Sequence, residues 1–295
     1  MEVVIGIPAF NEEKNIASII LKLKKITDKI IVCNDGSSDL TGPVAEKMGA
    51  IVITHTKNLG YGAAIRSLFE KASDMNADAL ITFDADGQHR IEDINPVLEP
   101  ILKNEVDIVI GSRFLGNNGK NVPAYRKAGI KTITSLANIS TDIKLTDSQS
   151  GFRAYNKRVL KEITPSDQGM GVSTEILIKS SKKGFKIKEV PITILYEGDT
   201  STHHPVSHGI SVILSTMKFI SIEHPLKFYG IPGIFFLALG LGFIVWTIQI
   251  FTITRQVVTN VALIGLASII VATMLIMTAI MLFSLVNVVR ERRSE

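Results

Sequence analysis

Residues 79–88 have the sequence ALITFDADGQ, in which a short apolar run passes directly into acidic and amide side chains. The apolar part, residues 79–84, has the length and composition of a buried β-strand. Similar β-branched runs occur at residues 2–8, 29–35, 50–56 and 107–113. Stretches with helical spacing separate the runs, near residues 13–25, 40–48, 61–73 and 91–103. This alternation predicts an α/β fold with a mainly parallel sheet and helices on both faces.

Polar residues follow four of these strands at the point where each strand is expected to end. They are residues 8–13 (PAFNEE), 34–39 (NDGSSD), 83–88 (FDADGQ) and 111–114 (GSRF). In open parallel sheets, ligands bind beyond the carboxyl ends of the strands. We therefore expect the chemistry of the protein at this edge of the sheet.

Asp84 and Asp86 are carboxylates at positions i and i+2, directly after a strand. A divalent cation that bridges them to a diphosphate would cancel their repulsion and stabilise a departing nucleotide. Gln88 adds a neutral oxygen, and a set made only of oxygens suits Mg²⁺ or Mn²⁺ rather than zinc. Residues 60–62 (GYG) lack the third glycine of a dinucleotide-binding loop. The nucleotide is therefore expected to be held by metal and loop side chains.

The C-terminal part of the chain is almost free of charge, because Arg255 is the only ionised side chain between residues 228 and 289. Two uncharged runs, residues 229–251 and 261–289, are each long enough to cross a bilayer. The alternative interpretation is a pair of buried core helices in a soluble protein. The flanking basic residues are Lys218, Lys227, Arg290, Arg292 and Arg293. The positive-inside rule then predicts a multi-pass protein of the cell membrane, with the N-terminal domain and the tail in the cytosol.

These patterns divide the chain into a cytosolic α/β domain (1–205), a juxtamembrane amphipathic helix (206–227), two membrane spans (228–289) and a basic cytosolic tail (290–295). The amphipathic helix is expected either on the membrane surface or packed against the domain. Residues 1–227 hold 28 basic and 26 acidic side chains, so no basic surface for nucleic acid is expected. The chain begins directly with a strand, so no signal peptide is expected.

Six motifs occur in a fixed order: IPAFNEE, NDGSSDLT, NLGYGAAIR, FDADGQH, GSRF and DSQSGFRAY. Together they resemble the family 2 glycosyltransferases with a GT-A fold. The most similar branch is that of the dolichol-phosphate mannose synthases and polyprenyl-phosphate glucosyltransferases. The resemblance covers roughly residues 2–205.

Carried over position by position, the resemblance implies contacts to a nucleotide-sugar donor. Pro8, Phe10 and Glu12 would line the base and the ribose. Asp35 would accept a hydrogen bond from the base or ribose beside Cys33, the single cysteine, which lies in an apolar run typical of a buried thiol.

On the diphosphate side, the resemblance implies that Asp84 and Ala85 flank the nucleotide. Asp86 and Gln88, with Asp84, would hold the Mg²⁺ or Mn²⁺ ion. Arg113 would lie where the acceptor phosphate meets the donor.

On the acceptor side, Asp147 stands where the family places its candidate base, with a turn-forming aspartate as the alternative. Gly151 would permit a close approach of the main chain. The cations expected to position an acceptor phosphate are Arg113, Arg126 and Lys131, although the last two could be solvated helix charges. Residues 196–204 carry only His203 and His204 where relatives often have Arg or Lys, which leaves the role of these two histidines open. Glu175 is a weaker candidate, expected on a helix capped by Ser173.

The reaction implied is metal-dependent transfer of one sugar, with inversion, from UDP-glucose or GDP-mannose to a polyprenyl or dolichyl phosphate at the cytosolic face of the membrane, a step typical of protein glycosylation. A phosphate monoester is already anionic near neutral pH, so positioning cations matter more than a strong base. The alternative acceptor is a glycolipid or glycan. Membrane lipids are expected partners, nucleic acid is not, and the oligomeric state is left open.

Three other classes fit the sequence less well. A processive polysaccharide synthase would need a Q-x-x-R-W motif, but the only tryptophan, Trp246, lies in the first predicted span. A nucleotidyltransferase would be expected to have a loop rich in glycine and arginine where PAFNEE stands. An inactive adaptor would be expected to have lost Asp84, Asp86 or Arg113, and all three are present.

Overall fold

The computed structural model describes residues 1–116, 122, 124–141, 143–195, 214, 217–218, 220–222 and 224–294. It divides the chain into two compact units, Met1–Thr216 and Met217–Glu295. The first unit contains the sheet and all of the motifs. The second unit contains the two apolar helices.

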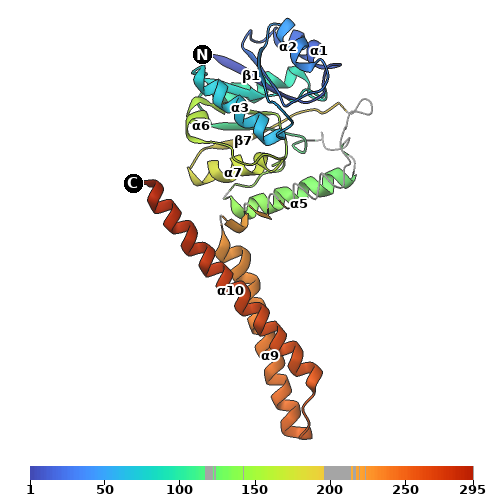
Figure 1. The fold of residues 1–295 in the computed structure, drawn as a ribbon, viewed down its shortest axis with the longest axis vertical. Coiled ribbons are helices and arrows are strands. Elements are labelled where there is room, and N and C mark those ends of the chain that lie inside the picture. The colour runs from blue at the N-terminus through green and yellow to red at the C-terminus, as the bar shows by residue number, and fades with distance from the viewer. Residues whose placement is uncertain are drawn as a thin grey trace. The chain divides into compact units, whose positions relative to one another are not determined.

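The N-terminal unit is built on one seven-stranded sheet in the order β3-β2-β1-β4-β6-β5-β7 (Figure 1). The strands are β1 (Val3–Ala9), β2 (Ile30–Asn34), β3 (Ile51–Thr54), β4 (Ala79–Thr82), β5 (Ile108–Ser112), β6 (Arg153–Asn156) and β7 (Ile187–Pro191). β6 runs antiparallel to β4 and β5, and the other pairs are parallel. The predicted mainly parallel sheet is confirmed.

Helices cover both faces of this sheet because β1, β2, β4 and β5 bury apolar residues on both of their faces. The helices are α1 (Ile16–Leu23), α2 (Thr41–Lys47), α3 (Tyr61–Asp74), α4 (Ile94–Leu102, after a 3₁₀ turn Ile91–Asp93), α5 (Ala124–Ser140), α6 (Lys157–Glu162) and α7 (Val172–Lys182). In β1, Ile5 and Ile7 belong to the core cluster that includes residues of α1 and α4, whereas Val4 belongs to the cluster that includes residues of α3 and α7.

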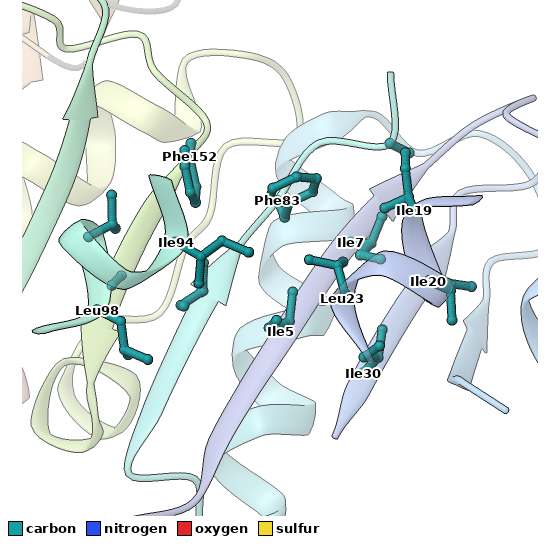
Figure 2. Packing of buried hydrophobic residues seen from close by; sticks show 14 of the residues in the cluster. Ile5, Ile7, Ile19, Ile20, Leu23, Ile30, Phe83, Ile94, Leu98 and Phe152 are labelled. Carbon is teal, nitrogen blue, oxygen red and sulfur yellow. The ribbon is translucent and has the colours of Figure 1, made fainter. Parts of the chain in front are cut away.

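The first of these clusters shows how the sheet is anchored. Figure 2 shows Ile19, Ile20 and Leu23 of α1 beside the strand residues Ile5 and Ile30. All five have at most 4% of their surface exposed. Each buried aliphatic side chain contributes about 1.5–3 kcal/mol, so the strand ends beyond this core rest on a rigid support.

The second unit consists mainly of α9 (Ile231–Thr254) and α10 (Thr259–Ser294), which lie side by side (Figure 1). A π-helical turn (Leu226–Gly230) precedes α9, and Arg255, with φ of 55°, ends it. Both helices are long and apolar enough to span a membrane, with only 6% and 11% of their most apolar windows buried. This exposure argues against the core-helix alternative. For the predicted span 229–251, α9 continues past residue 251 to Thr254. For the predicted span 261–289, α10 begins earlier, at Thr259, and ends later, at Ser294.

Some predictions fall outside the described residues. They concern residues 196–204, with His203 and His204, and most of the expected helix at 206–227. The side chains of Arg126, Arg290, Arg292 and Arg293 are also outside the described part of the chain.

Candidate active site

The carboxyl ends of β1, β2 and β4 lie side by side because β1 pairs with both of the other strands. The loops after these strands carry Glu12, Asp35, Asp84 and Asp86. Their proximity is visible in the electrostatics: burial raises the pKa of Glu12 most, a hydrogen bond from Asn15 opposes this, and the charges of Asp86 and Asp84 raise it further. The structure thus brings the predicted donor residues to one edge of the sheet.

The loop after β1 is held by the loop after β2. Asn11, whose φ of 56° lies in the left-handed region that asparagine tolerates, donates its main-chain N–H to Ser37 Oγ at 3.0 Å. Its Oδ1 accepts from the Ser38 N–H at 2.9 Å. The Glu12 N–H donates to Thr41 Oγ1 at 2.7 Å. These contacts explain physically why PAFNEE and NDGSSDLT occur together, since each loop needs the other for its hydrogen bonds.

Asp35 is 3% exposed and ties the loop after β2 to the start of α3. Its carboxylate accepts from the main-chain N–H groups of Leu59 at 2.9 Å and Gly60 at 2.8 Å. Cys33 has no exposed surface, and burial, followed by the charge of Asp35, raises the pKa of its thiol to about 12. The thiol is therefore neutral and lies below the surface that a nucleotide would touch, which leaves Asp35 as the candidate contact.

Asp84 is held through both of its oxygens. The Tyr61 hydroxyl donates to Oδ1 at 3.3 Å, and His89 Nε2 lies 3.1 Å from Oδ2. Because a carboxylate only accepts, His89 carries a proton on Nε2. Burial acts to raise the pKa of Asp84, but the hydrogen bonds from His89 and Tyr61 outweigh it and lower the pKa, with help from the charge of Arg113. Asp84 is an oriented, ionised group.

Gly151 brings the loop before β6 against this carboxylate. A Cβ at this position would lie 2.5 Å from the Tyr61 hydroxyl and 2.7 Å from Asp84 Oδ2. Thr82 Oγ1 donates to the Gly151 carbonyl at 2.6 Å and fixes the approach. The close main-chain approach predicted at Gly151 is confirmed.

Asp86 is the carboxylate best suited to a divalent ion. Burial and then the charge of Asp84 raise its pKa, and a cation between the two groups would relieve this repulsion. The Gln88 N–H donates to Asp86 Oδ1 at 3.0 Å, so these two residues share one tight turn. Within the described part of the chain, no group of three or more His, Cys, Asp or Glu side chains could hold a metal. Asp84 and Asp86 alone are too few ligands for such an ion, so the metal site predicted at Asp84, Asp86 and Gln88 stays a prediction that would need further oxygen ligands from a bound diphosphate.

Arg113 and Asp147 form a bidentate ion pair. Arg113 Nε lies 2.6 Å from Asp147 Oδ2, Nη2 lies 2.8 Å from Oδ1, and the Arg113 main-chain N–H donates to Oδ2 at 3.1 Å. The Asp147 side chain has no exposed surface, whereas 19% of the Arg113 side chain is exposed. A base needs a lone pair that substrate can reach, so this geometry does not favour the predicted role of Asp147 as base.

The loop that carries Asp147 is clamped by residues that the motif analysis did not single out. Glu189 of β7 accepts from the N–H groups of Thr146 at 2.8 Å and Asp147 at 2.9 Å. Arg153, 1% exposed, donates to the carbonyls of Ser148, Ser150 and Ser173 at 2.7–2.8 Å. Arg153 belongs to the DSQSGFRAY motif, so the sequence did contain a feature that could have identified it. Glu189 lies on a strand that the hydrophobic pattern did not predict.

Glu175 also supports the site from outside it. It is fully buried on α7 and accepts from the N–H groups of Ser166, at 2.9 Å, and Asp167, at 2.8 Å. The loop before α7, which contains Asp167, contacts the start of α3, where a Cβ on Gly62 would lie 2.0 Å from the Asp167 carbonyl. The glycines around Tyr61 thus admit a packed loop. Ser173 is not the helix cap, because Gly171 occupies that position.

The remaining predicted residues occupy different surroundings. Pro8 and Ala85 are buried, Phe10 is half-buried, and Lys131 is exposed on α5.

Comparison with known proteins places these features in a family context. The family model "Glycosyl transferase family 2" matches residues 4–164. The UDP-N-acetylglucosamine–dolichyl-phosphate N-acetylglucosaminyltransferase of Methanococcus voltae is 33% identical over 234 residues, which cover 72% of this chain and 91% of that protein. The dolichyl-phosphate hexose transferase of Haloferax volcanii is 30% identical over 231 residues, which cover 77% and 96% respectively.

Among solved structures, the chain is similar to glucosyl-3-phosphoglycerate synthase from Mycobacterium tuberculosis, crystallised with Mn²⁺, UDP and glucosyl-3-phosphoglycerate. The TM-score is 0.57 at 20% identity, over 74% of this chain and 79% of that one. At this identity the similarity bears on the fold alone.

Proposed function

Because this chain belongs to glycosyl transferase family 2, we propose that it transfers a single sugar from a nucleotide sugar to the phosphate of a polyprenyl or dolichyl lipid, with inversion at the anomeric carbon. The family match confirms the resemblance inferred from the six motifs, so the protein is a glycosyltransferase. The names of the two curated relatives support dolichyl phosphate as the acceptor.

The observation that carries this proposal is that acidic side chains and an arginine follow two strands at the same edge of the sheet. Asp84 and Asp86 follow β4, and Arg113 follows β5. The charge of Arg113 contributes to lowering the pKa of Asp84, so the two groups lie within electrostatic reach. A diphosphate would bind near the two aspartates through a cation, and an anionic nucleophile would bind at Arg113.

The chain's own residues would divide the work as follows. The nucleoside would be held by Asp35, Glu12, Phe10 and Pro8, with Ala85 flanking the nucleotide. Asp84, fixed by its two hydrogen-bond donors, would orient the donor. These positions remain the contacts implied by the family resemblance.

Asp86 and Gln88, next to Asp84, would hold Mg²⁺ or Mn²⁺. The ion would neutralise charge that develops on the leaving nucleoside diphosphate.

On the acceptor side, Arg113 would bind the lipid phosphate and aim one of its oxygens at the anomeric carbon. Asp147 would act by holding the guanidinium in place. Since the phosphate oxygen is already anionic near neutral pH, no proton needs to be removed as the bond forms. Arg126 and Lys131 remain candidate second contacts to the phosphate.

Transfer to lipid is tested with the purified full chain in detergent, with Mg²⁺ or Mn²⁺ and labelled UDP-glucose, GDP-mannose or UDP-N-acetylglucosamine. We expect one donor to label a lipid extract when polyprenyl phosphate is present, and no label with polyprenol, which lacks the phosphate. If label moves only to an added glycolipid or glycan, the alternative acceptor is correct and the lipid-phosphate assignment is wrong.

The two apolar helices support a membrane location, and we propose that residues 1–205 and 290–295 lie in the cytosol, on either side of the spans at 228–289 in the chain. The basic residues that flank the apolar segments support this sidedness. Protease added to sealed inside-out vesicles should digest the N-terminal domain. Full protection of the domain in such vesicles, with digestion only after detergent is added, would reverse the topology.

A further inference from the structure

A buried chain of polar side chains lies behind Asp35, and neither the motifs nor the proposed reaction uses it. His55, which follows β3, places Nδ1 2.6 Å from Asp35 Oδ1. Its Nε2 lies 2.9 Å from Ser67 Oγ on α3 and 3.7 Å from Cys33 Sγ. Only 11% of the His55 side chain and 5% of the Asp35 side chain are exposed. Because these side chains are buried, each of these hydrogen bonds is stronger than it would be in water.

The protonation pattern of this chain follows from the chemistry of its members. The Asp35 carboxylate can only accept, so His55 Nδ1 carries a proton and donates it. Ser67 Oγ can donate to the unprotonated Nε2 of a neutral imidazole, or accept from Nε2 if the ring is charged. The bond between His55 and Asp35 is therefore kept in either state.

The order Asp, His, Ser is also that of a hydrolytic triad, but the surroundings differ from a nucleophile site. Ser67 lies in the middle of α3 (Tyr61–Asp74), where main-chain N–H groups bond within the helix and are not available to an oxyanion. Asp35 is also engaged with two main-chain N–H groups of the loop before α3. These features indicate a device that fixes Asp35 rather than one that activates Ser67.

We propose that His55 is a positioning residue for donor binding, which acts through Asp35 and makes no contact with substrate itself. The inference rests on the proposed function, in which Asp35 contacts the nucleoside of the donor. It adds the group that sets the direction of that contact.

The carboxylate of Asp35 shows why its direction matters. An ionised carboxylate offers about four acceptor positions. The described contacts of Asp35 fill three of them: His55 and Leu59 on Oδ1, and Gly60 on Oδ2. The remaining position on Oδ2 suits one N–H or O–H donor of a base or ribose. Without His55, Oδ1 would have an acceptor position to fill, and the carboxylate could rotate away from the donor.

Two variants of similar size separate this role from simple packing. In His55→Asn, the amide nitrogen stands as many bonds from Cβ as Nδ1 does, so the bond to Asp35 can be kept. In His55→Gln, the amide nitrogen stands where Nε2 does, so the bond to Ser67 can be kept and the bond to Asp35 is lost. The full chain in detergent is used for both, and thermal midpoints report whether each variant folds.

Binding of UDP and GDP, measured by calorimetry with Mn²⁺ present, gives a readout that needs no lipid acceptor. For the nucleotide that the wild type binds, we expect His55→Gln to raise Kd, and KM for the matching sugar donor, about 10-fold. We expect kcat to stay within about 2-fold and His55→Asn to stay within about 3-fold of wild type in Kd.

Each other outcome has a defined meaning. Equal Kd values for wild type and His55→Gln, or a loss confined to kcat, would overturn the role of His55 and leave the proposed function intact. Equal losses in both variants would mean that the ring matters for packing, which also overturns the inference. If the wild type binds neither nucleotide, then Asp35 contacts no nucleoside, and the inference falls together with the donor side of the proposed function.

Discussion

Replacement of Asp86 by alanine is expected to lower kcat at least about 1,000-fold, because the leaving diphosphate would lose the ion that balances its charge. Sugar transfer to polyprenyl phosphate in detergent, with excess Mg²⁺ or Mn²⁺, measures the loss. Asp74→Ala is a matched control, since Asp74 is an exposed acidic residue at the end of α3, outside the site. Normal turnover by Asp86→Ala would remove Asp86 from the metal site.

Removal of the charge of Asp86 should lower activity without lowering the stability of the fold. Burial and the charge of Asp84 raise the pKa of Asp86 above 3.8. The folded state thus holds this proton more tightly than the unfolded chain does, and stability falls as pH rises from about 3.8 through the raised pKa. At pH 7 the carboxylate is a cost to folding. Asp86→Asn is therefore expected to keep or raise the thermal midpoint while it loses activity, and a clear fall in the midpoint would contradict this account.

The second large effect concerns Arg113 and Asp147, which we expect to act as one unit. Arg113→Ala should lower kcat/KM for the lipid phosphate about 100- to 1,000-fold, because the nucleophile loses its positioning cation. Asp147→Ala should cost nearly as much, since it frees the guanidinium that the carboxylate holds at 2.6 and 2.8 Å. The double variant should be no worse than Arg113→Ala alone, because the second change removes the partner of a group already lost.

This cycle separates positioning from base catalysis. If Asp147 removed a proton in its own right, the two losses would multiply, and the double variant would fall far below either single one. Because removal of one member of a buried pair can destabilise the fold, rates are normalised to folded protein, and Asp147→Asn serves as a milder second variant. Multiplying losses would restore Asp147 as the base.

The part of the fold that the sequence predicts well is the half in which hydrophobic runs and local spacing decide the structure. β1, β2 and β4 are apolar on both faces, so their runs stand out, and the loops after them carry the candidate residues. β6 and β7 were not predicted. β6 begins with Arg153, whose burial depends on the carbonyls of Ser148 and Ser150 in the preceding loop and of Ser173 on α7. In β7 only Val190 is buried, and the strand carries the charged residues Lys188 and Glu189.

The residues of the candidate site also differ in how well the sequence predicts them. Asp84 and Asp86 are visible from their spacing after a strand, whereas the partners of Asp84, Tyr61 and His89, are set by tertiary contacts. Asp147 shows the reverse case: a motif marked the residue, but only the three-dimensional pairing with Arg113 indicates that its carboxylate is already engaged. A sequence pattern gives residue type and order, and the direction of a lone pair depends on groups far away in the chain.

The most direct test of the central claim is the chemical linkage in the lipid product, determined by mass spectrometry and by ¹H and ³¹P NMR of material made by the purified full chain. An α-linked nucleotide sugar should give a lipid in which C1 of one sugar is joined to phosphate in the β configuration. A retained α configuration would contradict direct attack by a lipid phosphate. A sugar bound directly to the lipid alcohol through one oxygen, with no phosphate between them, would also contradict it.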